Sequence, residues 1–165
     1  MITDNYINES GDKCISIGEK SKKPIIFNNV LNKCKIGIET KDNSTPRIIN
    51  NVIVNNEIGL NAYRKKEIFE DGGKPKVYNS IIWDNDIEVQ DDKFSKTKIY
   101  YSDIEGGYEG EGNISVNPNV SLWSIKKVSK DEALQNVDNI DMVSDILEKI
   151  LDVDTASIGL IRDIK

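Results

Sequence analysis

The feature that most constrains this chain is an internal repeat, whose clearest copy spans residues 46–60. Residues 24–38 align with that copy without a gap, 22 positions earlier. Residues 75–89 keep the same order of apolar residues and asparagines but begin 29 positions later, and residues 97–104 follow after a further 22. A fixed period in the twenties is typical of a solenoid, in which each repeat forms one turn and packs on the next.

Each copy carries apolar residues two positions apart, which predicts short strands with one face turned inward. The pairs are Ile15/Ile17, Ile36/Ile38, Ile58/Leu60 and Ile87/Val89. A leucine-rich repeat has a similar period, but its spaced leucines are absent, while β-branched residues and asparagines dominate. The pattern therefore predicts an all-β solenoid, a parallel β-helix over residues 1–120. With a less regular N-terminal copy, it has about five coils.

Asparagines recur at fixed positions of the repeat. Because adjacent turns of a parallel coil lie roughly 4.7–4.9 Å apart, equivalent side chains stack directly above one another. One predicted column has amides that satisfy turn backbone groups as a structural ladder, and it consists of Asn5, Asn28, Asn50 and Asn79. A second, shorter column contains Asn29 and Asn51 and continues through Ser80 and Ser102. A structural role is favoured over a catalytic one for both columns.

These columns resemble the right-handed parallel β-helix of the pectate-lyase-like superfamily. Residues 11–21 and 101–118 are also similar to segments of bacterial surface and secreted β-helix proteins, the second typically near the C-terminal end of the helix. The resemblance covers residues 2 to about 120, and it implies an extracellular or cell-surface location. This scaffold hosts lyases, hydrolases, epimerases, adhesins and inert stalks, so the resemblance implies a fold rather than an activity.

The composition excludes several classes of function. The net charge of −6 and the pI near 4.8 disfavour nucleic acid and anionic membranes as partners, because a phosphate backbone selects basic clusters. No run of about 18 apolar residues occurs, so no membrane span is predicted. The chain has no histidine, which excludes Ser-His-Asp and Cys-His catalytic arrangements and removes a common zinc ligand.

The two ends of the chain differ from the repeats between them. The N-terminus begins inside the repeat and lacks the charged and apolar regions of a signal peptide. An open first coil predicts a fragment of a longer solenoid or end-to-end association with a partner. After Pro118, residues 129–132 form a capping box. They precede an apolar stripe at helical spacing, made by Ile140, Val143, Ile146, Leu147, Ile150 and Leu151.

We expect residues 121–165 to form a short α-helical C-terminal cap folded over the open coil. The alternative is an amphipathic helix that docks on a partner.

Residues 61–74 carry the seven extra residues and predict a loop that projects from the coil. Tyr63 is a candidate to stack on a sugar ring, while Arg64 and Lys66 are candidates to pair with a carboxylate. Arg64 and Lys65 are the candidates for a catalytic base. The alternative, which we favour, is a solvated loop whose apolar residues cover part of the coil.

Asp84 and Asp86 come nearest to a functional carboxylate pair in the repeats, and Asp91 and Asp92 follow them. At positions i and i+2 of an extended chain Asp84 and Asp86 share a face, which suits a hard cation such as Ca²⁺. The repeat also aligns Asp86 with Glu57 and Lys35, so the favoured alternative is an exposed row of stacked salt bridges at a turn.

The only two cysteines, Cys14 and Cys34, are 20 residues apart and lie near the same turn of adjacent coils. Buried free thiols are favoured because the alignment leaves the two residues one column out of register. A disulfide between coils is the alternative.

The leading functional hypothesis is a non-enzymatic β-helix scaffold, a carbohydrate-associated or adhesive module of a bacterial surface or secreted protein, with a polysaccharide or surface glycan as its partner. It rests on regular stacking without a recognisable catalytic constellation. The first alternative is a calcium-dependent polysaccharide lyase that uses Asp84 and Asp86 for the metal and Arg64 or Lys65 as the base. The second is a truncated fragment without independent function.

Overall fold

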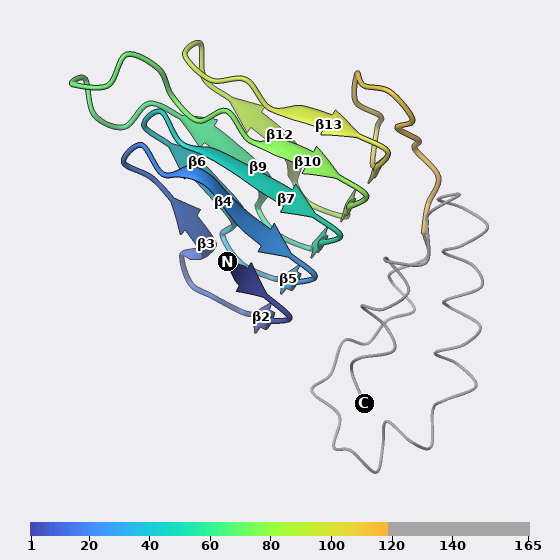
Figure 1. The fold of residues 1–165 in the computed structure, drawn as a ribbon. Coiled ribbons are helices and arrows are strands. Elements are labelled where there is room, and N and C mark those ends of the chain that lie inside the picture. Colours follow the sequence, from blue (N-terminus) through green and yellow to red (C-terminus); the bar gives the residue numbers. More distant parts are fainter. Residues whose placement is uncertain (119–165) are drawn as a thin grey trace.

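The computed structural model describes residues 1–118 and shows an all-parallel β-solenoid (Figure 1). In this part of the chain the strands form three sheets, and each turn adds one strand to each sheet. The predicted all-β solenoid is therefore confirmed, with about four complete turns where the repeats predict about five. The last copy adds strands to only two sheets, so it does not complete a turn. The predicted C-terminal helical cap, residues 121–165, lies outside the described residues. Residues 1–118 contain no helix able to cross a membrane.

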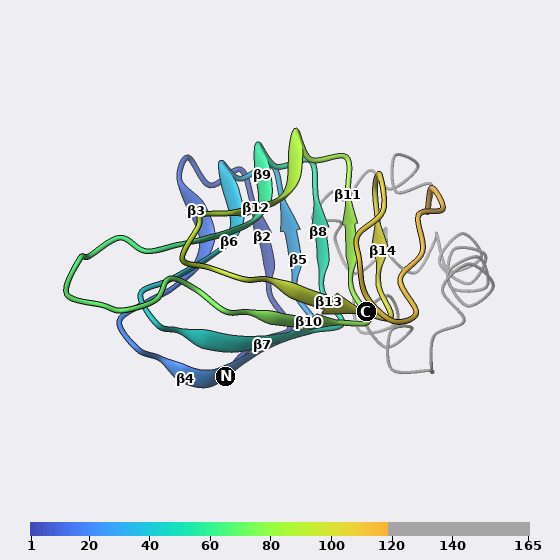
Figure 2. The same cartoon turned by 90° about the horizontal axis from the view of Figure 1, so that it is seen from above.

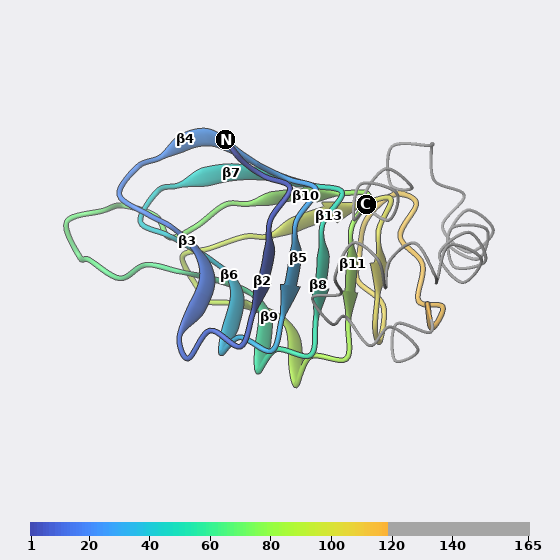
Figure 3. The same ribbon diagram turned by 90° about the horizontal axis from the view of Figure 1, so that it is seen from below.

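The three sheets are named A, B and C in the order in which the chain enters them. Sheet A contains β1 (Ile2–Thr3), β4 (Lys22–Phe27), β7 (Thr45–Ile49), β10 (Lys76–Tyr78) and β13 (Lys98–Tyr100). Sheet B contains β2 (Tyr6–Asn8), β5 (Val30–Asn32), β8 (Val52–Val54), β11 (Ile81–Trp83) and β14 (Asp103–Ile104). Sheet C contains β3 (Lys13–Ile17), β6 (Ile36–Lys41), β9 (Ile58–Tyr63) and β12 (Ile87–Asp91). Figures 2 and 3 show the strands of each sheet side by side.

The strand register reproduces the repeat period. Ile48 lies opposite Ile26 and Val77, and Val77 lies opposite Ile99, so the spacings are 22, 29 and 22 residues. The seven-residue insertion therefore leaves the register of sheet A unchanged. Between the second and third coils, the register shifts between Lys22 and Ile25, where β4 carries an irregularity.

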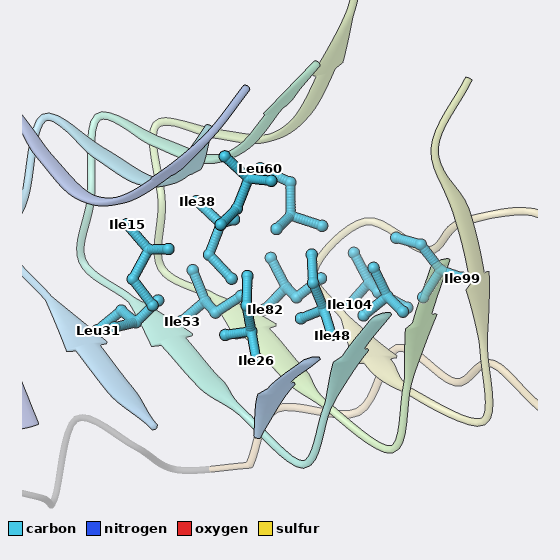
Figure 4. Packing of buried hydrophobic residues seen from close by; sticks show 12 residues of the cluster. Ile15, Ile26, Leu31, Ile38, Ile48, Ile53, Leu60, Ile82, Ile99 and Ile104 are labelled. Atoms are coloured by element: carbon cyan, nitrogen blue, oxygen red, sulfur yellow. The ribbon is translucent and has the colours of Figure 1, made fainter. Parts of the chain in front are cut away.

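Isoleucine and leucine columns fill the interior of the coil (Figure 4). Sheet A contributes Ile26, Ile48, Val77 and Ile99; sheet B contributes Leu31, Ile53, Ile82 and Ile104; sheet C contributes Ile15, Ile17, Ile38 and Leu60. Full burial of such a side chain stabilises the fold by about 1.5–3 kcal/mol. Stacked columns of one shape let every turn pack on the next in the same way, which is why the repeat pattern specifies the core.

The corner between sheets A and B holds a continuous side-chain ladder. The Asn5 amide donates to Asn29 Oδ1 at 2.8 Å, and the Asn29 amide donates to Asn51 Oδ1 at 2.9 Å. The Asn51 N–H then donates to Ser80 Oγ at 3.1 Å. Ser102 and Asn113 continue the column, because Ser102 Oγ accepts from the Ser80 N–H and Asn113 Oδ1 accepts from the Ser102 N–H.

The ladder thus runs through the second predicted column. Asn5, which the sequence places in the first column, belongs to the second, because the pairing of β1 with β4 puts it opposite Asn29. The first predicted column has a different role. Asn28, Asn50 and Asn79 have φ values of 59°, 53° and 46°, so their backbone is left-handed. Asparagine adopts this conformation more readily than most residues, which explains its recurrence at this corner. The Oδ1 atoms of Asn28 and Asn50 are buried without a hydrogen-bond partner.

Cys14 and Cys34 form a disulfide, with their Cα atoms 5.8 Å apart. The expectation of free thiols is therefore wrong. Cys14 lies on β3 in sheet C, and Cys34 lies at the corner that follows β5. The disulfide links the first coil to the second. The two cysteines occupy different positions of the repeat, so an alignment of the copies does not show that they are close in space.

Candidate functional site

The outer face of sheet A carries a column of cations. Arg47 lies opposite Lys76 on the next turn, and Lys76 lies opposite Lys98 on the turn after that. All three side chains are exposed. Because neighbouring parallel strands are about 4.8 Å apart, these positive charges repeat at close to that interval along the solenoid.

Two further lysines lie beside this column. Lys74 and Lys96 precede Lys76 and Lys98 by two residues, so they share the outer face in extended chain. The intervening Pro75 and Thr97 are buried, which agrees with this alternation. Lys74 Nζ lies 2.5 Å from a carboxylate oxygen of Asp71, so its charge is partly compensated.

An apolar and aromatic column borders the cations. Its members are half-buried residues. Ile49, Tyr78 and Tyr100 follow the three cations by two positions, and Phe27 lies opposite Ile49 on the preceding turn. The Tyr78 and Tyr100 rings stack with centroids 5.3 Å apart and an interplanar angle of 18°. We call the surface formed by Arg47, Lys74, Lys76, Tyr78, Lys96, Lys98 and Tyr100 the sheet A face. It combines repeated positive charge with flat rings on one rigid surface.

The insertion loop between β9 and β10 is anchored to the coil by buried or half-buried side chains. One carboxylate oxygen of Asp42 accepts the backbone N–H groups of Lys65, at 2.8 Å, and of Lys66, at 3.0 Å. The Asp92 carboxylate accepts the N–H of Arg64 at 2.9 Å. These contacts fix the beginning of the loop at the corner between sheets C and A. Sequence periodicity alone does not reveal them, because the contacting residues come from three different turns.

The predicted binding residues of this loop contact other residues of the chain. The Tyr63 hydroxyl donates to Glu39 Oε2 at 2.9 Å, and burial together with this carboxylate raises the pKa of Tyr63. The Arg64 guanidinium carbon lies 3.5 Å from the centre of the Phe94 ring. Lys66 forms an ion pair with Glu19, whereas the Lys65 side chain is exposed. Tyr63, Arg64 and Lys66 therefore stabilise the loop and the coil beneath it.

Glu39 is the centre of a polar cluster that the repeat pattern does not predict. It lies in β6 with 1% of its surface exposed. Burial raises its pKa, but hydrogen bonds from Lys41, Ser16 and Tyr63 outweigh burial, and the pKa is lowered overall. A carboxylate with this many donors is satisfied, so the cluster serves to join β3, β6 and β9.

Asp84 and Asp86 lie far from the insertion loop along sheet C. Both residues precede β12, whereas Arg64 follows β9, which is parallel to β12. A five-residue strand spans about 17 Å, so the structure does not bring the predicted calcium ligands together with Arg64 or Lys65. Within residues 1–118 there is no group of three or more metal-ligating side chains.

Asp84 occupies a repeated turn position. Its φ of 55° matches those of Glu9, Lys33 and Asn55 at the corner between sheets B and C. Its backbone N–H donates to a carboxylate oxygen of Glu105 at 2.9 Å, and the Asp86 N–H donates to the Asn56 carbonyl at 3.0 Å. The local structure therefore explains both residues as parts of a turn.

A second ladder crosses this corner and ends in a carboxyl group. Asn56 Oδ1 accepts the Cys34 N–H, and the Asn56 amide donates to Asn85 Oδ1 at 2.8 Å. The Asn85 amide then donates to Glu88 Oε2 at 2.5 Å. Burial raises the pKa of Glu88 to about 7; hydrogen bonds from Asn85 oppose the shift, and nearby Glu105 reinforces it.

Glu88 occupies the position held by Gly37 and Gly59 in earlier turns. A Cβ on Gly59 would lie 3.1 Å from the Asn85 amide nitrogen, so the glycines leave room for the asparagine of the following turn. In the preceding turn, the asparagine amide donates a hydrogen bond to the asparagine of the next turn. In the last turn of sheet C, the Glu88 carboxylate accepts the hydrogen bond from the Asn85 amide instead. Glu88 therefore ends the ladder.

No protein-family model, curated protein or solved structure matches this chain.

Proposed function

We propose that this chain is a non-enzymatic scaffold module that binds an extended acidic polysaccharide along the sheet A face. The observation that carries the proposal is the exposed column of Arg47, Lys76 and Lys98 beside the stacked rings of Tyr78 and Tyr100. The solenoid holds these groups at fixed intervals, so it pre-organises the surface. A pre-organised surface loses little entropy on binding.

The chemistry of an acidic polysaccharide matches this surface. A uronic acid polymer carries carboxylates at regular intervals, and Lys and Arg form charge-assisted hydrogen bonds with carboxylates. Sugar rings present apolar C–H groups, which pack on tyrosine rings while the tyrosine hydroxyls remain available for hydrogen bonds. Repeated weak contacts along one polymer add up through effective concentration, so no single deep pocket is required.

Single-stranded nucleic acid is the rival ligand, because it is also recognised by cationic grooves and aromatic stacking. The net charge of −6 opposes the approach of any polyanion, so charge does not distinguish the two ligands. The Cys14–Cys34 disulfide favours the polysaccharide, because it supports a location in an oxidising compartment outside the cytoplasm.

The disulfide supports a location outside the cytoplasm. Cys14–Cys34 bridges persist in oxidising compartments, such as the periplasm and the cell exterior. This agrees with the resemblance to right-handed parallel β-helices of the pectate-lyase-like superfamily and with a bacterial surface or secreted parent protein. In that setting the module would attach its parent to an acidic glycan.

The test is affinity electrophoresis of the full chain in gels containing polygalacturonate, with uncharged dextran as the reference polymer. We expect retardation only by polygalacturonate, weakened several-fold in the variant with Lys76→Ala and Lys98→Ala. The matched control carries Lys33→Ala and Lys35→Ala, which remove the same charge at exposed positions outside sheet A. The proposal is wrong if both variants bind equally, or if an oligothymidylate competes more strongly than the polysaccharide.

A second arm separates binding from catalysis. The full chain is incubated with polygalacturonate, with and without Ca²⁺, and absorbance of unsaturated product is followed. We expect no product in either condition. Calcium-dependent product that disappears in Arg64→Ala or Asp84→Ala would instead establish a lyase and overturn the scaffold proposal.

A further inference from the structure

The charged residues at the corner between sheets B and C change along the solenoid. On the first two turns, opposite charges lie side by side. Lys33 Nζ lies 3.7 Å from Glu9 Oε1. Lys35 lies opposite Asp12 in the register of β3 and β6. The corner of these two turns therefore carries little net charge.

On the third, fourth and fifth turns, the same corner holds carboxylates without a matching cation. The position of Lys33 is occupied by Asn55 and then by Asp84, which have the same left-handed backbone. The position of Lys35 is occupied by an acidic residue on both the third and the fourth turn. Among residues 1–118, no lysine or arginine forms an ion pair with these carboxylates. We call this surface the acidic corner, and its exposed members are Glu57, Asp84, Asp86 and Glu105.

The turn uses the backbone of these residues and leaves their carboxylates exposed. Asp84 and Asp86 form their hydrogen bonds through backbone N–H groups. Glu105, on the fifth turn, accepts the N–H of Asp84 at 2.9 Å, which holds its side chain beside the corner. At least one carboxylate thus lies on each of three successive turns, at intervals of about 4.8 Å along the solenoid.

The sheet A face carries the opposite charge on the same three turns. Arg47, Lys76 and Lys98 belong to the third, fourth and fifth turns and repeat at the same interval. Of the three corners of the described coil, the one between sheets B and C is the corner that sheet A does not adjoin (Figure 3). The two charged surfaces therefore point away from each other and do not neutralise each other within one molecule.

We propose that a second copy of this chain is the partner of the acidic corner, which binds the sheet A face of that copy with the two solenoids side by side. In this arrangement the three cationic turns of one copy meet the three acidic turns of the other. Because one solenoid geometry sets both spacings, the charges stay in step over all three turns. Charge complementarity of this kind steers association and fixes register.

The contact joins different surfaces of the two copies, so it is heterologous. Each copy keeps one unoccupied surface of each kind, so the association produces open rows rather than a closed dimer. Exposed ion pairs are individually weak and are screened by salt, which makes the rows sensitive to ionic strength. A second copy and an acidic polysaccharide exclude each other at the sheet A face, but neither proposal depends on the other.

The first test is sedimentation velocity of the full chain over a wide range of protein concentration. We expect the weight-average sedimentation coefficient to rise with concentration at low ionic strength and to return to the monomer value at high ionic strength. A monomer at every concentration and low ionic strength would overturn the proposal. Association that high ionic strength leaves unchanged would assign it to an apolar contact instead.

The second test uses two variants that cancel one charged surface each. Lys76→Glu with Lys98→Glu removes the net positive charge of the sheet A face. Asp84→Lys with Asp86→Lys removes the net negative charge of the acidic corner, and the second turn carries lysines at both equivalent positions, one of them with a φ of 53°. Far-ultraviolet circular dichroism checks that both variants retain the β-solenoid.

Each variant alone should remain monomeric at low ionic strength. An equimolar mixture should associate into mixed pairs, because the intact acidic corner of one variant meets the intact sheet A face of the other. The matched control, Lys33→Glu with Lys35→Glu, changes the net charge as much as Lys76→Glu with Lys98→Glu but leaves both surfaces intact, so it should associate like the unmodified chain. Association of either variant alone, a monomeric mixture, or a monomeric control would overturn the proposal.

Discussion

Sheets A and B of this solenoid share one register and one core, yet their outer faces differ completely. On sheet A the outward positions hold exposed Arg47, Lys76 and Lys98, whereas on sheet B they hold buried Val54 and Trp83. The inward positions of both sheets are isoleucine, leucine or valine. In a β-solenoid, the inward residues therefore determine the coil, and the outward residues determine what each side of it contacts.

The largest expected difference between the faces is in stability. Trp83→Ala should lower the free energy of unfolding by about 3–5 kcal/mol, because the Trp83 side chain is buried and its removal leaves a cavity. Tyr78→Ala on sheet A should lower it by only about 0.5–1.5 kcal/mol, chiefly through loss of stacking on Tyr100. Urea unfolding of the full chain, followed by circular dichroism, measures both. Equal losses would contradict the distinction between the buried Trp83 and the half-buried Tyr78.

Removing the disulfide tests how much the link between the first two coils contributes to the stability of the whole solenoid. Cys14→Ser with Cys34→Ser should lower the free energy of unfolding by about 2–4 kcal/mol, since the bridge constrains the unfolded chain. Reductant should produce the same loss in the unmodified protein and no further loss in the double variant. A reductant-independent unfolding midpoint would show that the bridge contributes nothing to stability.

Asn50 and Asn51, at the corner between sheets A and B, allow the two asparagine columns to be compared at adjacent residues. Asn51→Ala removes the acceptor of the Asn29 N–H and the donor to the carbonyls of Ile26 and Ile49, so we expect a loss of about 1–3 kcal/mol. Asn50→Gly should change stability by less than about 0.5 kcal/mol, because glycine adopts a φ of 53° freely. Thermal unfolding compares the two. A larger loss in Asn50→Gly would mean that the first asparagine column carries the ladder.

The smallest effect concerns pH. The pKa values of Glu88 and Asp103 are raised by burial, to about 7 and about 6, above the usual values of 4.5 and 3.8. The folded state therefore binds protons that the unfolded state releases, so stability falls as pH rises from about 4.5 to 7. The melting temperature should be a few degrees higher at pH 5 than at pH 7.5, and Glu88→Gln should reduce this difference. A melting temperature that rises over this range would contradict it.

Below that range other carboxylates reverse the trend. Hydrogen bonds from Asn28 and Lys13 lower the pKa values of Asp4 and Asp12, while hydrogen bonding and charge from Lys66 lower that of Glu19. Their stabilising contributions are lost when pH falls through these lowered pKa values. The melting temperature should therefore pass through a maximum in mildly acidic solution.

The fold was predictable from sequence because its determinants repeat. Ile26 and Ile48 are recognisable as equivalent by their spacing alone, and the same spacing locates the insertion. The asparagine columns were also visible, but the periodicity does not distinguish a left-handed turn residue such as Asn50 from its hydrogen-bonding neighbour Asn51. That distinction depends on backbone conformation at each corner.

The candidate site was harder to find. The sheet A face arises from residues 22 and 29 positions apart, each ordinary in its own turn, and only the register places Arg47, Lys76 and Lys98 in one column. The insertion loop instead predicts Tyr63 and Arg64 as binding residues, but their side chains contact Glu39 and Phe94. Reading the outward positions down each column, as well as the inward ones, would have identified the basic surface.

The insertion between β9 and β10 has a consequence for how such a chain can change. Its seven extra residues enter at a corner and leave without altering the pairing of Val77 with Ile48 or Ile99. Loop-closure entropy grows slowly with length, so further residues at this corner would disturb the coil little. The corner lies beside the lysines of sheet A, so length variation there can reshape one edge of the surface while selection on the core continues unchanged. For protein engineering, it is the natural place to graft a foreign peptide.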